Sequence, residues 1–551
     1  MAKGLTHAGR ISCALMLGWL AGCAEPRVPA GGPRDTTPPG LLNSEPPNEA
    51  VNFSGESVRL EFTEYVNQAS FARAFSITPE PAGQPRFRWR KRRVTIEYGT
   101  LFRDSTTYVI SLGNDLRDMR GVALKNPITL AFSTGNIIDQ GRIRGRVVES
   151  RLGLPAAGLD ILAYAVRGDS VAGTPSYRTQ SSEDGSFALS YLREGQYFVA
   201  AVQDRNRDLR PSLGELFAAP PVPAVMATPD TMAAAYRWVV SRLDTIAPQI
   251  DRVRSLSSTR LQVRFSEPVV LSQLAPGIWS LVDSLTGRHV TVRALYLTAD
   301  NARNVYLRTD PLQDRVYGLR PDPAVTDSSG NSVSAAVLHF TSSARADTTI
   351  TRFTGFLPLD SADALGLAPF EVPQVMFNEA LLDMSPTALL TVTDPSGAQR
   401  DVRSVTRDGT TYALQFVPPL AEDDTIGVAI RDPAGRGTYT HHFARAGSHA
   451  LGGLSGGVLP VSVHTIIDLL NPAGQILLST TADSTGKFIF DGLPEGEYHI
   501  RAYIDANSNG RWDGGQVSPY VAPEPVTWLR APERVRPRWN TTLGDTLRIL
   551  S

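Results

Sequence analysis

The chain has 551 residues, which at about 100–150 residues per domain predicts four to five domains. Its 54 Lys and Arg and its 55 Asp and Glu give a net charge of -1, which argues against a nucleic-acid partner, because such partners bind strongly basic faces. The only cysteines are Cys13 and Cys23, so no cysteine remains further along the chain for a disulfide or a metal site.

The first 22 residues have the pattern of a secretion signal. Lys3 and Arg10 precede an apolar run over residues 11–20, which is too short to span a bilayer. The run ends in Leu20-Ala21-Gly22-Cys23, which resembles the lipobox of bacterial lipoproteins. That resemblance implies cleavage before Cys23 and acylation of its thiol and new amino group, which would anchor the chain in a membrane. The alternative is an ordinary signal peptide with an incidental cysteine.

The residues after Cys23 indicate to which membrane the protein is sorted and how far its domains can lie from that membrane. The lipoprotein resemblance implies the outer membrane as destination, because Ala24 rather than Asp follows Cys23. Residues 24–39 are rich in Pro and Gly with almost no bulky apolar residue, a composition typical of a semi-extended tether. Fully stretched, this tether would reach about 50 Å at ~3.3 Å per residue.

A first repeat recurs three times downstream. Its signature is Phe-polar-Glu at the end of a run in which apolar and polar residues alternate, the period of a half-buried strand. The three copies occupy residues 58–64, 261–267 and 374–379. An Asp-Thr pair stands before each copy, and an Asp-x-x-Gly turn and a strand ending in Phe follow it. The aspartates that open the pairs and turns are Asp35, Asp244, Asp347, Asp118, Asp327 and Asp432.

The first copy also carries Phe87-Arg88-Trp89, Thr107-Tyr108-Val109 and Phe132-Ser133-Thr134. Together these short runs resemble bacterial immunoglobulin-like domains of the S-layer type. The resemblance is strongest for the first copy and weakest for the third, and it implies a β-sandwich for each.

A second repeat occurs twice at a constant offset. It has the form G-x-F, then L-x-x-G-x-Y, in which the first glycine suits a hairpin turn. The matched positions are Gly185, Phe187, Leu192, Gly195 and Tyr197 in one copy, and Gly486, Phe488, Leu493, Gly496 and Tyr498 in the other. The pattern resembles the carboxypeptidase-regulatory, transthyretin-like sandwich, which also occurs in collagen-adhesin B-type repeats.

We therefore predict an all-β protein, a tandem array of Ig-like and transthyretin-like β-sandwiches behind a lipoprotein signal peptide. The predicted division is 1–22 signal peptide, 23–39 lipidated tether, 40–136 Ig-like, 137–243 regulatory-like, 244–345 Ig-like, 346–446 Ig-like and 447–551 regulatory-like.

Two loops that follow the second repeat are candidate calcium sites. The later one matches D-x-[DN]-x-[DN]-G, a spacing that turns several oxygens towards one hard cation. Its candidate ligands are Asp505, Asn507, Asn509, Asp513 and the carbonyl of Arg511. The twelfth position, where a bidentate Glu is expected, is Gln516.

The earlier loop is the weaker candidate. It offers Asp204, Asn206, Asp208 and Glu215, but Leu209 stands where the glycine is expected. Any affinity for calcium is predicted to be weak, with a dissociation constant on the order of 10⁻⁴–10⁻³ M. The alternative for both loops is a set of Asx turns that satisfy their own backbone.

Other motifs favour structural interpretations. Ser455 lies in a G-x-S-x-G run, which we interpret as a glycine-rich interdomain joint because no strand–helix alternation surrounds it. The repeated Glu64, Glu267 and Glu379 are interpreted as structural hydrogen-bonding or edge charges.

Two further motifs raise the question of a zinc or nucleic-acid site. His441 and His442 are strand neighbours that point to opposite faces, so no zinc site is predicted. Residues 86–93 alternate Arg with Phe87 and Trp89, which predicts a core strand with a basic outer face.

The functional prediction is a noncatalytic, lipid-anchored cell-envelope protein with a structural, adhesive or binding role. Its expected partners are the membrane, through the lipid, and an envelope protein or glycan at loops on the domain ends. A first alternative is an accessory carbohydrate-binding or assembly component of an envelope enzyme or transport system. A second is a hydrolase that uses Ser455 or the repeated glutamates.

Overall fold

The computed structural model describes residues 35–549, apart from 100–101, 168–169, 172, 213, 230–235, 243, 245, 272–276, 278, 299–300, 328, 359–365, 383 and 407. Cys23, the secretion signal and most of the tether therefore lie outside the described residues.

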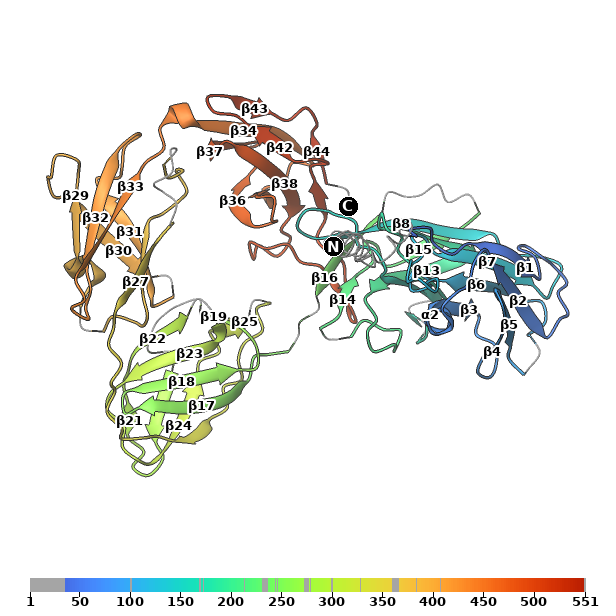
Figure 1. The fold of residues 1–551 in the computed structure, drawn as a ribbon, viewed down its shortest axis with the longest axis horizontal. Coiled ribbons are helices and arrows are strands. Elements are labelled where there is room, and N and C mark those ends of the chain that lie inside the picture. Colours follow the sequence, from blue (N-terminus) through green and yellow to red (C-terminus); the bar gives the residue numbers. More distant parts are fainter. Residues whose placement is uncertain are drawn as a thin grey trace, which may run out of the picture.

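The prediction of an all-β protein is confirmed. The described residues form five β-sandwiches, each around its own buried apolar core (Figure 1). In this part of the chain, α-helix is confined to α2 (Gln68–Ala74), and short 3-10 turns occur at η2 (Pro386–Leu389) and η3 (Ser448–Ala450). None of the helices described is long and apolar enough to cross a bilayer.

The first, third and fourth sandwiches share one strand order in their four-stranded sheets. In the first sandwich the order is β1 (Leu41–Glu45), β2 (Ser57–Phe62), β5 (Arg93–Glu97) and β4 (Arg86–Arg90). In the third it is β17 (Ile250–Ser257), β18 (Arg260–Phe265), β23 (Asn301–Thr309) and β22 (Val292–Thr298). In the fourth it is β27 (Phe353–Leu357), β28 (Gln374–Phe377), β31 (Thr411–Val417) and β30 (Asp401–Thr406).

A second sheet closes each of these cores. The first sandwich adds β3 (Phe75–Thr78), β6 (Thr107–Leu112) and β7 (Ile128–Ser133). The third adds β21 (His289–Val290), β20 (Trp279–Asp283), β24 (Val316–Pro321) and β26 (Leu338–Thr341), beside the pair β19 (Val269–Leu271) and β25 (Val325–Asp327). The fourth adds β29 (Leu390–Thr393), β32 (Thr425–Arg431) and β33 (Thr438–Ala444).

The Phe-polar-Glu strand takes the second place in each four-stranded sheet, as β2, β18 and β28. Val58, Leu60 and Phe62 are buried on β2, while the residues between them are more exposed. The alternation read from the sequence is thus the alternation of a half-buried strand, and the Glu of the motif follows at the strand end.

The second sandwich is one continuous path of strands. The order is β10 (Ser170–Val171), β9 (Asp160–Arg167), β13 (Gly195–Val202), β14 (Leu216–Ala218), β16 (Arg237–Arg242), β8 (Gly141–Glu149) and β12 (Ser186–Leu192). Off this path, β11 (Tyr177–Gln180) pairs with β9 and β15 (Val225–Ala227) pairs with β13.

The fifth sandwich has a similar strand order, divided between separate sheets. One sheet contains β37 (Lys487–Pro494), β34 (Leu451–Leu459) and β43 (Asn540–Thr542), with β44 (Leu547–Arg548) also on β34. The other contains β36 (Ile476–Thr481), β35 (Thr465–Leu470), β38 (Gly496–Ile504) and β41 (Val526–Trp528), with β42 (Glu533–Val535) on β38. In both sandwiches the opening strand, β8 or β34, pairs in parallel with a late strand, β16 or β43.

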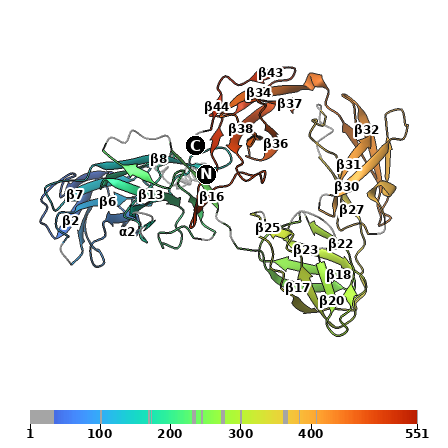
Figure 2. The same ribbon diagram turned by 180° about the vertical axis from the view of Figure 1, so that it is seen from behind.

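The array closes on itself, because the fifth sandwich contacts the second (Figures 1 and 2). The hairpin of β39 (Gln516–Val517) and β40 (Tyr520–Val521) packs on the outer face of the second sandwich. Tyr520 Oη donates to Pro220 O at 3.1 Å, and its ring meets Phe198 edge-on at 5.7 Å. Trp528 Nε1 donates to Arg151 O at 3.0 Å. The second to fifth sandwiches therefore form a ring, and the first sandwich extends outward from the second (Figures 1 and 2).

Candidate functional site

The fifth sandwich carries the predicted Asp- and Asn-rich loop directly after β38. Asp505 is only 4% exposed, and its carboxylate accepts hydrogen bonds from the backbone N–H groups of Asn509 (3.1 Å) and Gly510 (2.8 Å). Gly510 has φ +75°, a left-handed conformation that glycine adopts without strain. Tyr503 Oη donates to Gly510 O at 3.2 Å. Asp505 thus closes a tight turn, as the motif requires.

The other predicted ligands of this loop gather around Asp513. The Nδ2 atoms of Asn507 and Asn509 donate to Asp513 Oδ2 at 2.6 Å and 2.8 Å. The backbone N–H of Arg511 donates to Asn509 Oδ1 at 2.8 Å. The loop therefore brings the predicted residues together, with amide nitrogens facing the carboxylate. A cation would be held after both amides turn their oxygens inward.

Glu524 completes this loop, and the sequence analysis missed it. Glu524 is 7% exposed, and it accepts hydrogen bonds from Ala506 N (2.7 Å) and Asp513 N (2.9 Å). Burial raises the pKa of its carboxyl. Gln516, at the twelfth position, lies in β39 instead, because the hairpin that reaches the second sandwich is inserted between Asp513 and Glu524. An alignment with the earlier loop, which carries Glu215, would have predicted an acidic residue at the end of the later loop.

The loop after β13 has the same construction. Glu215 is 5% exposed and accepts from Arg205 N (2.8 Å) and Ser212 N (3.2 Å), as Glu524 does in the later loop. Asp204 Oδ2 accepts from Leu209 N at 3.0 Å, while Asp204 Oδ1 is buried without a hydrogen-bond partner.

Leu209 therefore takes the place of Gly510 rather than breaking the turn. It adopts φ +58°, and its side chain packs on the apolar outer face of the second sandwich. The two remaining predicted residues of this loop lie in contact, since Asn206 Nδ2 donates to Asp208 Oδ2 at 3.0 Å.

Two clusters of carboxylates were not predicted as sites. They join the three Ig-like motifs: the Asp of Asp-Thr, the Glu of Phe-polar-Glu and the Asp of Asp-x-x-Gly. The clusters are Asp35, Glu64 and Asp118 in the first sandwich, and Asp244, Glu267 and Asp327 in the third, with the facing oxygens of each cluster within 4.8 Å of one another. The motifs are far apart in the chain, and only the sandwich brings them to one point.

In each cluster, burial and neighbouring like charges raise the pKa of the glutamate. Burial, Asp118 and Asp35 raise the pKa of Glu64. Burial, Asp244 and Asp327 raise the pKa of Glu267. Glu64 and Glu267 therefore hold their negative charge less readily than free carboxylates, and an added positive charge nearby would stabilise their charged form.

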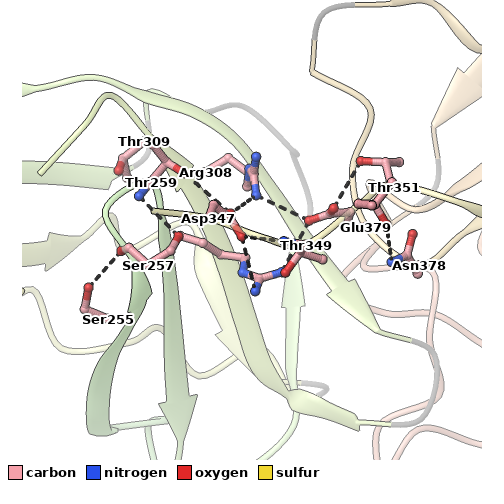
Figure 3. A network of polar contacts seen from close by, with 12 residues as sticks. Ser255, Ser257, Thr259, Arg308, Thr309, Asp347, Thr349, Thr351, Asn378 and Glu379 are labelled. Atoms are coloured by element: carbon pink, nitrogen blue, oxygen red, sulfur yellow. Dashed lines mark hydrogen bonds and ion pairs between the residues drawn. The ribbon is translucent and has the colours of Figure 1, made fainter. Parts of the chain in front are cut away.

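In the fourth sandwich, positive charge is supplied by the neighbouring sandwich (Figure 3). The equivalent acids are Asp347 and Glu379. Arg308 Nη1 lies 2.5 Å from Asp347 Oδ2 and 3.4 Å from Glu379 Oε2. Arg260 lies 3.6 Å from Asp347 and 3.5 Å from Glu379. Thr351 Oγ1 also donates to Glu379, at 3.0 Å. These ion pairs join the third and fourth sandwiches.

The structure corrects the interpretation of the glycine run around Ser455. This run is not an interdomain joint, because it lies inside β34, which pairs with β37 on one side and β43 on the other. Ser455 Oγ lies 3.2 Å from Thr542 Oγ1 in a continuous strand, with no strand-to-helix turn. A Cβ on Gly456 would lie 2.8 Å from the side chains of Leu543 and Phe488, so glycine is needed for close packing.

The basic strand at residues 86–90 lies as the sequence indicated. Phe87 and Trp89 on β4 pack against the first core through Phe71, with ring centroids 5.2 Å apart in both pairs, and the arginines of the strand face out. His441 stacks on Phe356, with ring centroids 5.3 Å apart.

A polar groove lies where the first and second sandwiches meet. Its lining includes Thr129, Arg144, Arg146, Gln180 and Arg237. Burial and the charges of Arg146 and Arg530 lower the pKa of Arg237, so positive charges crowd this groove.

Residues 35–134 match the bacterial Ig-like domain family Big_5. No curated protein matches the chain. Among solved structures, the chain is similar to the N-terminal part of the bacterial S-layer protein SbsC, at 12% identity over 36% of this chain and 44% of that chain, with a TM-score of 0.17. The chain thus spans less than half of that SbsC fragment.

Two further solved structures show similarity at the same level. One is an L,D-transpeptidase from Mycobacterium smegmatis, at 16% identity over 30% of this chain and 77% of that chain, with a TM-score of 0.15. The other is BcpA, the major pilin subunit of Bacillus cereus, at 9% identity over 75% of this chain and all of that chain, with a TM-score of 0.14. TM-scores this low define neither the fold nor the function of this chain.

Proposed function

We propose that this chain is a noncatalytic, lipid-anchored protein of the bacterial cell envelope with a structural or adhesive role. The observation that carries the proposal is the order of its parts. A lipobox-like Leu20-Ala21-Gly22-Cys23 and a Pro- and Gly-rich tether lead into a β-sandwich that matches a bacterial Ig-like family, followed by four more sandwiches. Several acyl chains on one cysteine suffice for stable anchoring. The tether then holds the ring of sandwiches away from the bilayer.

Metabolic labelling with a palmitate analogue tests the anchor. The full chain and its Cys23→Ser variant are expressed in a bacterial host and immunoprecipitated. Label is expected in the wild-type chain and absent from the variant. Equal label in both would overturn the proposed lipid site, and Cys13→Ser serves as the matched control that should keep its label.

We infer that the loops after β38 and β13 bind calcium weakly. Asp505, Asp513 and Glu524 supply carboxylates around one turn, and Asp204 keeps one buried carboxylate oxygen free of hydrogen bonds. Hard cations prefer such oxygen ligands, with dissociation constants on the order of 10⁻⁴–10⁻³ M in extracellular modules. Calorimetric titration of the full chain and of Asp505→Asn tests the later loop. Loss of one binding event in the variant supports the site, and an unchanged isotherm rejects it.

A second candidate function, binding of an acidic glycan, is favoured by the groove between the first and second sandwiches. Arg144 and Arg146 are exposed there beside Arg237. Binding of a heparin fragment by the full chain should weaken at least tenfold in an Arg144→Ala, Arg146→Ala double variant. Arg88→Ala, an exposed arginine on β4, is the control. Equal affinity in the double variant would exclude the groove.

A further inference from the structure

We propose that the carboxylate cluster of the first sandwich binds a divalent cation of the calcium class. The site is Asp35–Glu64–Asp118. It is separate from the loops after β13 and β38, which belong to other sandwiches.

The first argument is an unsatisfied buried oxygen. Asp118 is 2% exposed, and its Oδ1 accepts from Arg120 N at 2.9 Å and from Val122 N at 2.7 Å. Its Oδ2 is buried with no hydrogen-bond partner. A buried carboxylate oxygen without a partner costs free energy, and an oxygen-seeking cation at the cluster would satisfy it.

The second argument is the balance of charge. The nearby cation of the first cluster is Arg120, whose Nη1 lies 2.8 Å from Asp35 Oδ2, but its side chain is 72% exposed. One solvated guanidinium offsets three carboxylates only in part. In the third sandwich, the Asn331 amide donates to Asp327 Oδ2 and to Asp244 O, and Arg303 is a nearby positive charge for Glu267. The buried aspartate of the third-sandwich cluster is thus satisfied by Asn331, whereas negative charge and an unpaired oxygen remain at the first cluster.

The third argument comes from the fourth sandwich, which works as an internal comparison. Two of its three acids at the same motif positions, Asp347 and Glu379, are paired with Arg260 and Arg308 of the third sandwich. Where a neighbouring sandwich offers arginines, these motif acids are thus paired with positive charge. In the first sandwich the structure assigns that role to a bound cation.

The position of the cluster indicates what the cation does. Asp35 belongs to the end of the tether, just before the first sandwich. Glu64 and Asp118 belong to the body of that sandwich. A cation shared between them fixes the tether to the sandwich, as Arg308 fixes the third sandwich to the fourth.

Counting bound calcium tests the proposal. The full chain is stripped with EDTA and dialysed against ⁴⁵Ca²⁺ at about 1 mM, close to the range expected for extracellular sites. Glu64→Gln is expected to lose one calcium per chain. Glu379→Gln is the matched control, because arginines satisfy the same position in the fourth sandwich, and it should bind as much calcium as the wild type. Unchanged calcium in Glu64→Gln overturns the site.

A stability measurement separates loss of the site from loss of the fold. In EDTA, Glu64→Gln should unfold at or above the wild-type temperature, because it removes a like charge. With calcium added, only the wild type should gain stability at the first sandwich. If Glu64→Gln gains as much as the wild type, the site is rejected. The Asp505→Asn variant loses calcium at the β38 loop alone, so failure there leaves this test intact.

Discussion

Arg308 Nη1 lies 3.4 Å from Glu379 Oε2, in an ion pair that crosses from the third sandwich to the fourth. The side chains are 16% and 2% exposed, so the pair is largely removed from water. Charges buried at such a contact set the relative orientation of the two bodies, because either one alone would be left uncompensated.

Arg308→Ala is expected to lower the free energy of unfolding by about 2–5 kcal/mol, because it leaves Asp347 and Glu379 with less compensating charge. Urea unfolding measures the loss. The control is Arg293→Ala, which removes the 2.6 Å pair with Asp310, where the side chains are 57% and 37% exposed, and should cost less than about 1 kcal/mol. Equal losses for the two variants would show that the joint is not held by this pair.

Tyr520→Ala should open the ring of sandwiches. Its hydroxyl bond to Pro220 and its ring contact with Phe198 are lost together. Small-angle X-ray scattering should then show a larger maximum dimension than for the wild type. The neighbouring Val521 is 51% exposed, and Val521→Ala should scatter like the wild type. A Tyr520→Ala profile that matches the wild type would mean that the ring is closed by other contacts.

Tyr197→Phe and Tyr498→Phe should destabilise their sandwiches to the same extent. Tyr197 Oη donates to Arg193 O and Tyr498 Oη donates to Pro494 O, both at 2.9 Å. Each variant is expected to cost about 1 kcal/mol, the usual net value of such a bond. Calorimetric unfolding gives the comparison, with the 56% exposed Tyr65 changed to Phe as control. No cost in either variant would contradict the structural role of the motif tyrosine.

Asp160→Asn should stabilise the second sandwich at neutral pH but not in acid. Burial raises the pKa of Asp160 to about 6 from its ordinary 3.8. Since the folded pKa is the higher one, folding favours the protonated form, and the stability it contributes is complete below pH 3.8 and lost as the pH rises through 6. At pH 7.5 the gain should approach about 3 kcal/mol, at ~1.4 kcal/mol for each tenfold change in proton affinity. Thermal unfolding at pH 7.5 and pH 4 checks it, and equal gains at both would refute the titration.

The strand pattern of the sandwiches could be predicted from the sequence. The alternation in Val58, Leu60 and Phe62 reports one buried face, and that periodicity is local. Gly185 and Gly486 could also be predicted as turn residues. Both have positive φ, and a Cβ at either would meet the carbonyl oxygen of the opening strand.

Features that depend on distant segments were not readable in the same way. Asp35, Glu64 and Asp118 were each noted as repeated motif residues, yet only the sandwich topology brings them within one cation's reach. Glu524 was not predicted, because an inserted hairpin changes the fixed spacing of the loop motif. The contact that closes the ring was not predicted either, since Tyr520 and Phe198 are brought together only by the arrangement of whole sandwiches.

Membrane fractionation tests the proposed function most directly. Cells that produce the wild-type chain or Cys23→Ser are lysed, and their membranes are separated on a sucrose density gradient. The account predicts that the wild-type chain sediments with the outer membrane and that Cys23→Ser moves to the soluble periplasmic fraction. A Cys23→Ser chain that still sediments with the outer membrane would contradict lipid anchoring through this cysteine.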